Sequence, residues 1–210
     1  MENKKYTVIE VVADYIYFVI TGKLNTLNKF INKLDSNKKY IPVRIDIPLA
    51  YAGEKLEKEY DIKIIIEEGV KIVFTSAGNP AKYTAWLKER GITVVHVIAN
   101  TKFAKKCEEA GVDAIVAEGF EAGGHNGREE TTTLCLVPLI VDTVKIPVIA
   151  AGGIGCGRTM AAAICLGASG VQVGSRFAAS VESSAHDKFK EQIIGAKEGS
   201  TELTLKEITP

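Results

Sequence analysis

The sequence has no surplus of charge and no long apolar run, and each absence excludes a class of protein. Its 26 basic residues balance its 26 acidic residues, and no polybasic tract is present. Neither nucleic acid nor an anionic membrane is therefore an expected partner. The most apolar early run, YIYFVIT (15–21), is too short to span a membrane and lacks the flanks of a signal peptide. We expect a cytoplasmic protein.

Cysteine and histidine are too scarce and too scattered for a metal site. The chain has four cysteines and three histidines, with no CxxC pair and no metal-ligand spacing between the two residue types. We expect no bound metal, and we expect the cysteines to be small buried or half-buried thiols in a reducing compartment. They are Cys107, Cys135, Cys156 and Cys165.

From residue 40 onward the sequence alternates between two patterns. Helical stretches such as 79–91 and 101–111 end on glycine and lie between short β-branched runs. The runs cover 41–50, 71–77, 92–100, 112–120, 146–153 and 170–177. Apolar strands that alternate with helices indicate parallel βα units. Their regular length favours an α/β fold of the TIM-type (β/α) barrel class over an open doubly wound sheet. We expect one domain over residues 1–210.

Residues 1–40 fit this pattern less well. The run YIYFVITGK (15–23) is compatible with one more strand and residues 24–39 with one more amphipathic helix. The segment YTVIEVVAD (6–14) suits either a strand or the end of a helix. Eight-stranded barrels typically need about 250 residues. We therefore expect an incomplete barrel whose first βα unit is missing or replaced.

Two glycine-rich segments follow consecutive strand candidates. AGGIGCGR (151–158) leads into a helical stretch, and QVGSR (172–176) supplies further backbone amides and a serine hydroxyl. In such barrels a phosphate commonly lies at the loops after the last two strands and at a helix N-terminus. We expect a phosphate site here; two tight turns without a ligand are the alternative.

A longer glycine-rich loop, EAGGHNGREETTT (121–133), follows the run 112–120. Long loops on the ligand face are commonly functional, and His125 would project over the same cavity as the phosphate loops. A histidine can transfer a proton or hydrogen-bond an oxygen that gains charge. His125 is thus the catalytic candidate, with an ordinary polar loop residue as the alternative. The charges at 128–130 are either solvated or form a rim that locks the loop.

Three other features have structural interpretations. His96 lies within a strand candidate, as a core or barrel-interior histidine would, and His186 lies in the first turn of a helix. The segment FTSAGNP (74–80) places Asn79 and Pro80 at a helix start. Helix capping explains these residues, and so does room for a flat ring at a strand end.

The segments AEGFEAGGHNGREETTTLCLVP, IPVIAAGGIGCGR and GVQVGSRF, in this order, resemble the nitronate monooxygenase (2-nitropropane dioxygenase) family. That family is related to the FMN-dependent enoyl-acyl-carrier-protein reductase. The likeness covers residues 24–210, and residues 1–23 diverge. The resemblance implies an FMN-containing TIM barrel that oxidises a small-molecule substrate, an alkyl nitronate, with oxygen. The reductase branch instead uses a nicotinamide cofactor to reduce an enoyl thioester.

The resemblance also implies roles for individual residues. His125 matches the active-site histidine of the GGH motif. Positions beside the flavin ring, its ribityl chain or its phosphate are implied at Asp46, Glu118, Gly123, Gly124, Gly152, Gly153, Gln172, Val173, Gly174 and Ser175.

The sequence departs from the family pattern in two places. The QGGM-like segment that packs on the flavin ring has no counterpart, and the family's GVN reads RID, which puts Asp46 in place of an asparagine. The added negative charge would disfavour an anionic reduced ring. The chain also stops at LKEITP, before the family's C-terminal helices.

Three functions are compatible with these observations. FMN-dependent oxidation of alkyl nitronates is the first, and NAD(P)H-dependent enoyl-acyl-carrier-protein reduction is the second. The third is a truncated, non-catalytic protein that binds a flavin or a phosphate. An open barrel exposes strand edges and apolar interior, which a homodimer would cover.

Overall fold

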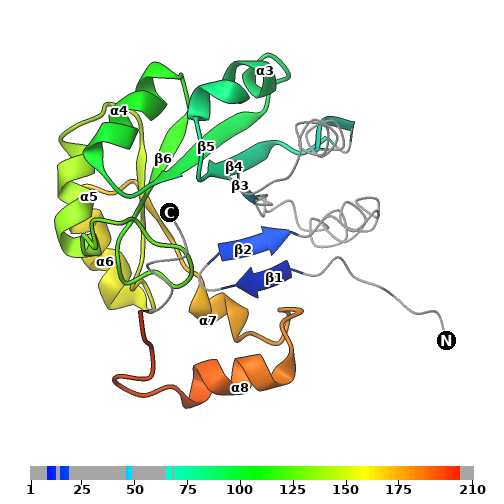
Figure 1. Cartoon of the computed structure of the whole chain (residues 1–210), viewed down its shortest axis with the longest axis vertical. Helices are drawn as coiled ribbons and strands as arrows, with labels where there is room; N and C mark the ends of the chain where they lie inside the picture. The colour runs from blue at the N-terminus through cyan, green and yellow to red at the C-terminus, as the bar shows by residue number, and fades with distance from the viewer. Residues whose placement is uncertain (1–8, 13–14, 19–45, 49–64, 68, 204–210) are drawn as a thin grey trace.

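The computed structural model describes residues 9–12, 15–18, 46–48, 65–67 and 69–203, with the backbone alone described up to residue 48. Its centre is a six-stranded parallel sheet in sequential order (Figure 1). The strands are β3 (Asp46–Pro48), β4 (Ile72–Ser76), β5 (Thr93–Ile98), β6 (Ala114–Glu118), β7 (Val148–Ala151) and β8 (Gly170–Gln172). Each strand falls within a predicted run.

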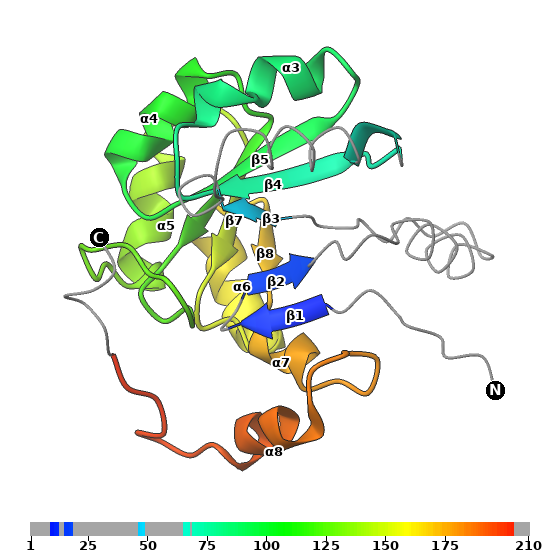
Figure 2. The ribbon, with the colours of Figure 1, turned by 45° about the vertical axis from the view of Figure 1, so that its right-hand side comes forward.

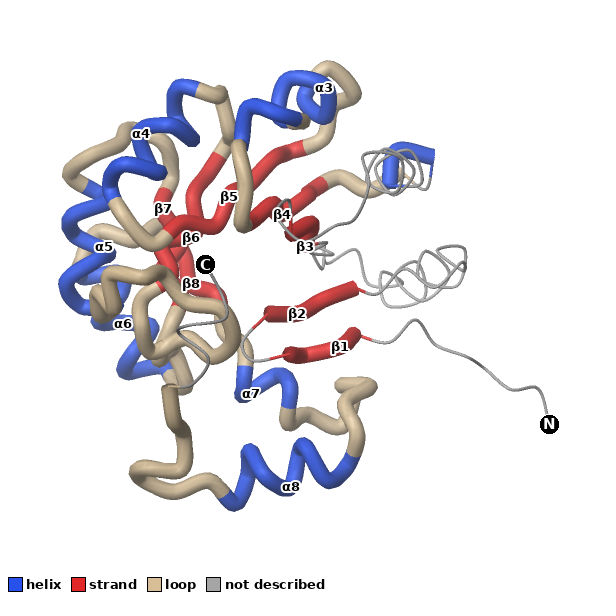
Figure 3. Tube along the Cα trace, viewed as in Figure 1, coloured by secondary structure: helices blue, strands red, loops and turns tan. Residues whose placement is uncertain are grey.

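Helices alternate with these strands and cover the outer face of the curved sheet (Figure 3). They are η2 (Pro80–Lys82), α3 (Thr84–Lys88), α4 (Thr101–Glu109), α5 (Thr133–Val141) and α6 (Gly157–Cys165). Two further helices, α7 (Ser175–Ala178) and α8 (Asp187–Gly195), follow β8 and lie below the sheet in the view of Figure 3. The arrangement is that of a TIM-type barrel. Within the described part of the chain, no helix has the length and apolar character that crossing a membrane requires.

Local chemistry sets the helix ends. The side chain of Asn100 accepts a hydrogen bond from the Phe103 amide at 2.9 Å and so caps α4. Asn79 caps η2 and His186 caps α8 in the same way. Helix capping, one of the two interpretations of Asn79, therefore applies. The glycines that end 79–91 and 101–111 both have positive φ, as helix termination requires.

The sheet buries apolar side chains on both faces. Along β5, Val94 and Ile98 belong to the large core between sheet and helices, whereas Val95 and Val97 belong to a smaller cluster on the opposite, barrel-interior face. Each such side chain contributes about 1.5–3 kcal/mol on burial. His96 alternates with Val95 and Val97, so it lies on the helix-facing side, 3% exposed. It is a core histidine.

The N-terminal region holds an antiparallel hairpin where a complete barrel would have a parallel βα unit, in agreement with the expectation that the first unit is missing or replaced. β1 (Ile9–Val12) and β2 (Tyr15–Phe18) form an antiparallel hairpin, and β2 lies beside β3 (Figure 2). Both segments are strands, but only two residues separate them. A connection that short can join antiparallel strands only, because a parallel crossover needs a dozen or more residues. The predicted helix at 24–39 lies outside the described residues.

Candidate functional site

A cavity of about 240 Å³ opens at the C-terminal ends of β6, β7 and β8. This is the end of the sheet where barrels and open α/β folds bind ligands. The loops after β7 and β8 both contribute to its wall, as the two glycine-rich segments predicted. The lining residues are Glu118, Glu121, Ala122, Ala151, Gly152, Gly153, Ile154, Gly155, Gln172, Gly174, Ser175 and Arg176.

The glycine pair after β7 is required by backbone geometry. Gly152 has φ +101° and Gly153 has φ +67°, a region that side chains disfavour. A Cβ on Gly152 would also lie 2.7 Å from Thr133 Oγ1 and 2.9 Å from the Gly119 carbonyl oxygen. The loop after β7 therefore packs directly against the loop after β6, and this close approach shapes the cavity wall.

Thr133, at the start of α5, connects these two loops. Its amide and hydroxyl donate to Glu121 Oε2 at 2.7 and 2.8 Å, and its hydroxyl lies 3.0 Å from the Gly152 carbonyl oxygen. Thr133 is 7% exposed. Buried polar groups with several partners rigidify their surroundings. Two residues of the cavity wall, Glu121 and Gly152, are thus held by one buried side chain.

The last residue of β8 and the first turn of α7 bring two polar side chains to the cavity. The Gln172 Oε1 atom is buried, and it has no hydrogen-bond partner among the described residues. Arg176 donates from Nη1 to the Gly155 carbonyl oxygen at 3.2 Å. This bond joins the first turn of α7 to the loop after β7.

The start of α6 is less available to an anion than expected. The amides of Gly155 and Cys156 both donate to Thr159 Oγ1 at 3.2 Å. An anion at the helix start would have to replace these internal bonds.

The loop that carries His125 is fixed by its own polar groups. The Phe120 amide donates to the Thr131 carbonyl at 2.9 Å, and Asn126 Nδ2 donates to the Ala122 carbonyl at 2.9 Å. Asn100 Nδ2 donates to Glu129 Oε1 at 2.8 Å, so Glu129 locks the loop to the start of α4. For Glu129 this agrees with the second interpretation, a rim that locks the loop; all three charged residues at 128–130 are exposed.

Burial and hydrogen bonding move three pKa values. Burial lowers the pKa of His96 to about 4 and raises the pKa of Cys107 to about 12. At the N-cap of α6, hydrogen bonds from the backbone amides of Thr159 and Arg158 lower the pKa of Cys156 to about 7. His96 Nδ1 and Thr75 Oγ1 are hydrogen-bonded at 2.6 Å.

The expectation of buried or half-buried cysteines was wrong for most of them. Only Cys107 is buried; Cys135, Cys156 and Cys165 are exposed. Cys135 and Cys165 lie on the outer helices α5 and α6, where one side of each helix faces solvent rather than the sheet. No group of three or more potential metal ligands occurs in the part of the chain that the structure describes.

The family model for nitronate monooxygenases matches residues 19–207. The chain belongs to the nitronate monooxygenase family. A protein of Staphylococcus saprophyticus named probable nitronate monooxygenase is 39% identical over 170 residues, which are 76% of this chain and 48% of that protein. A Staphylococcus aureus protein of the same name is 39% identical over 171 residues, 77% of this chain and 48% of that protein. The chain therefore spans about half the length of the curated relatives it matches.

Solved structures confirm the predicted family and fold. FabK from Thermotoga maritima superposes with a TM-score of 0.73 at 41% identity, over 93% of this chain and 63% of FabK. A point mutant of that FabK reaches 0.70 at 46% identity, over 83% and 57% of the two chains. Nitroalkane oxidase from Streptomyces ansochromogenes gives 0.64 at 26% identity, over 80% and 59%. The family that the chain matches is one of oxidoreductases.

The cavity of this nitronate monooxygenase family member brings together many of the residues predicted for cofactor binding, but not all of them. Those that line it are Glu118, Gly152, Gly153, Gln172, Gly174 and Ser175. Those that do not are Gly123, Gly124 and Val173, and the same holds for the catalytic candidate His125, which is exposed. Asp46 begins β3 and is in register with Phe74.

Several lining residues were not predicted from the sequence. Glu121 and Ala122 stand in the quoted EAGGH segment, and Ile154 and Gly155 stand in AGGIGCGR, so motif membership was an available signal for them. Arg176 closes the QVGSR segment, and its charge beside a predicted phosphate loop was a signal as well.

Proposed function

We propose that this chain binds FMN in the cavity at the ends of β6, β7 and β8 and serves the oxidation of alkyl nitronates. The observation that carries the proposal is the meeting of the Gly152–Gly153 turn, Gln172 and the Gly174–Ser175 turn around one cavity. These segments are separate in sequence, and the family resemblance implied each of them independently of the fold.

The residues present fit a flavin mononucleotide. Its polyol chain offers hydroxyl donors, and the cavity offers buried acceptors in the Glu118 carboxylate and the Gln172 Oε1 atom, which lacks a partner among the described residues. Its phosphate calls for backbone amides in glycine turns, which Gly153 and Gly174 supply. FMN, when bound, supplies the acceptor for the substrate's electrons.

The protein's own task is to bind and orient the nitronate and to manage protons. His125 lies in the loop after β6, which three hydrogen bonds fix. In the proposed function its imidazole hydrogen-bonds the nitro oxygens or moves a proton at the substrate.

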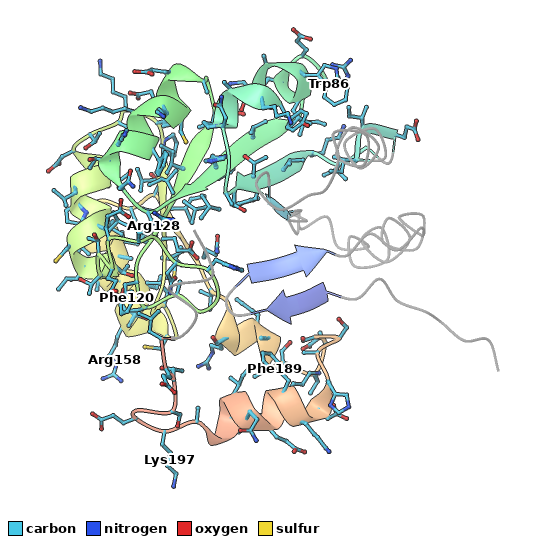
Figure 4. The ribbon with its side chains drawn as sticks, viewed as in Figure 1. Trp86, Phe120, Arg128, Arg158, Phe189 and Lys197 are labelled. Carbon is cyan, nitrogen blue, oxygen red and sulfur yellow. The ribbon has the colours of Figure 1, made fainter. Side chains whose placement is uncertain are left out.

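The decisive experiment combines flavin content with turnover. The purified chain is incubated with FMN, desalted and scanned for flavin absorbance, and oxygen uptake is then followed with the anion of a nitroalkane. We expect bound flavin and oxygen consumption. His125→Ala should keep the flavin and reduce turnover by about 100-fold or more. Arg128→Ala, in the same loop, is the matched control (Figure 4).

Other outcomes assign other functions. NADH consumption with a crotonyl thioester, without oxygen uptake, would indicate the reductase branch. Flavin binding without either turnover, together with an assembly larger than a monomer in size-exclusion chromatography, would indicate the non-catalytic alternative and a homodimer. Absence of flavin after incubation would overturn the proposed function.

A further inference from the structure

The charges around the cavity are unequal. Two carboxylates, Glu118 and Glu121, and one guanidinium, Arg176, are the ionisable side chains among the described residues that line it. Without Arg176 the cavity wall would carry only negative charge. A phosphate dianion entering such a cavity would meet repulsion from both carboxylates.

The order of the strands separates these charges. The Glu118 carboxylate belongs to β6, the glycine turn follows β7, and Arg176 follows β8, while the sheet runs β6–β7–β8. The acidic groups therefore lie at one side of the cavity and the cation at the other, with the glycine turn between them. A ligand with hydroxyl donors at one end and an anion at the other matches this polarity.

Arg176 is also placed to bind an anion. Its Nη1 atom donates to the Gly155 carbonyl at 3.2 Å. This bond holds the guanidinium beside the glycine-rich loop that follows β7. A guanidinium has five N–H donors, so a bond from one of them leaves others that can reach an anion. A guanidinium presents its donors as a planar fork that matches the oxygens of a phosphate.

We propose that Arg176 binds the phosphate of the flavin and makes the cavity selective for FMN over riboflavin. This inference rests on the proposed function and goes beyond it by naming a residue for ligand selection. Glycine turns contribute amides to any anion, whereas Arg176 supplies the positively charged side chain of a cavity wall that otherwise carries two carboxylates.

The test is a comparison of two ligands that differ only in the phosphate. Dissociation constants for FMN and riboflavin are measured by quenching of flavin fluorescence, at low and high salt, for the wild-type chain and Arg176→Gln. We expect Arg176→Gln to weaken FMN binding by about tenfold and to leave riboflavin binding within about twofold. The decrease of FMN affinity with salt should be smaller in the variant.

Two further variants separate the charge from other effects. Arg176→Lys keeps the charge without the fork, and we expect it to recover part of the FMN affinity. Arg158→Gln changes the net charge by the same amount on the neighbouring helix α6. Arg158 is not among the lining residues, and Figure 4 shows it directed outward. We expect this control to bind both flavins like the wild-type chain.

The possible results distinguish this inference from the proposed function. If the wild-type chain prefers FMN and Arg176→Gln keeps the same ratio of the two affinities, the role of Arg176 is overturned and the cofactor proposal stands. If Arg176→Gln loses FMN and riboflavin equally, Arg176 is only structural. If the wild-type chain binds neither flavin, both proposals fall.

Discussion

His96 is a buried base, and its environment makes a pH-dependent contribution to stability. Its pKa is about 4 in the folded chain, where burial disfavours the charged ring, and its ordinary value is 6.5. Between these values the unfolded chain binds the proton and the folded chain does not. The contribution of His96 to stability is therefore present above pH 6.5 and is lost as the pH falls toward 4.

The first prediction follows from this difference. We expect the free energy of unfolding, measured by urea titration, to fall by about 2 kcal/mol between pH 7 and pH 5 because of His96 alone. His96→Gln should be less stable at neutral pH but should show a pH dependence smaller by that amount. An equal decrease in both proteins would mean that another group is responsible.

Cys156 carries the second prediction at this scale. Its thiol is exposed, and the amides of the first turn of α6 stabilise the thiolate, with a pKa of about 7. Cys107 is buried, with a pKa of about 12. We expect iodoacetamide to modify Cys156 at a rate that rises with a midpoint near pH 7 and to leave Cys107 unmodified in the folded chain.

Mass spectrometry of the digested protein locates the label. The Cys156→Ser variant should lose only the component with the midpoint near pH 7. A midpoint above pH 8 for the Cys156 peptide would show that the helix start does not stabilise the thiolate. Cys135 and Cys165 are also exposed, and their peptides are followed separately in the same experiment.

At the scale of elements, the apolar runs predicted each strand of the central sheet because a buried parallel strand needs uninterrupted apolar residues. Boundaries were less predictable. The run 170–177 contains a strand of three residues, and α7 begins at Ser175 within it. The stretch 79–91 divides into η2 and α3, because Tyr83 between them has φ −128°, outside the helical region. Such interruptions depend on tertiary packing, which periodicity does not encode.

The candidate site likewise has features that the sequence predicts and features that it does not. Gly152 and Gly153 could be predicted, because paired glycines after a strand indicate a turn with positive φ. The contacts of Thr133 with Glu121 and of Arg176 with Gly155 could not. The bonded residues are 12 and 21 positions apart in the sequence, and only the fold brings them together.

The third prediction concerns the contact between the loops after β6 and β7. We expect Gly152→Ala to destabilise the chain by about 3 kcal/mol, because it combines a disfavoured φ with contacts of 2.7 and 2.9 Å. Gly119→Ala should cost a similar amount through packing alone, since its Cβ would lie 2.5 Å from the Thr133 Cα. Urea unfolding of both variants provides the measurement.

Gly91→Ala isolates the cost of the backbone angle. Gly91 has φ +70°, and a Cβ there would meet nothing within 4 Å. We expect this variant to lose about 1 kcal/mol. If Gly152→Ala is no worse than Gly91→Ala, the two loops do not pack as closely as the structure shows.

For the whole molecule, stability is distributed unevenly across the sheet. β5 has five consecutive buried residues and lies between β4 and β6. β8 is only partly buried, and among the described strands it pairs with β7 alone. Amides in a sheet exchange with solvent slowly where burial and pairing are complete. The cavity is therefore built partly on a strand that is only partly protected.

The last prediction uses hydrogen–deuterium exchange to connect this distribution with binding. Without ligand, we expect peptides from β5 and β6 to exchange slowest and peptides from β8 to exchange fast. Saturating FMN should slow exchange at 152–155 and 170–176 and leave α3 and α4 unchanged, because the cavity lies at the ends of β6 to β8 and the ligand stabilises only the state that binds it. Riboflavin should protect 170–176 less than FMN, since it lacks the phosphate that Arg176 is proposed to bind. Protection confined to other segments would place the flavin elsewhere on the molecule.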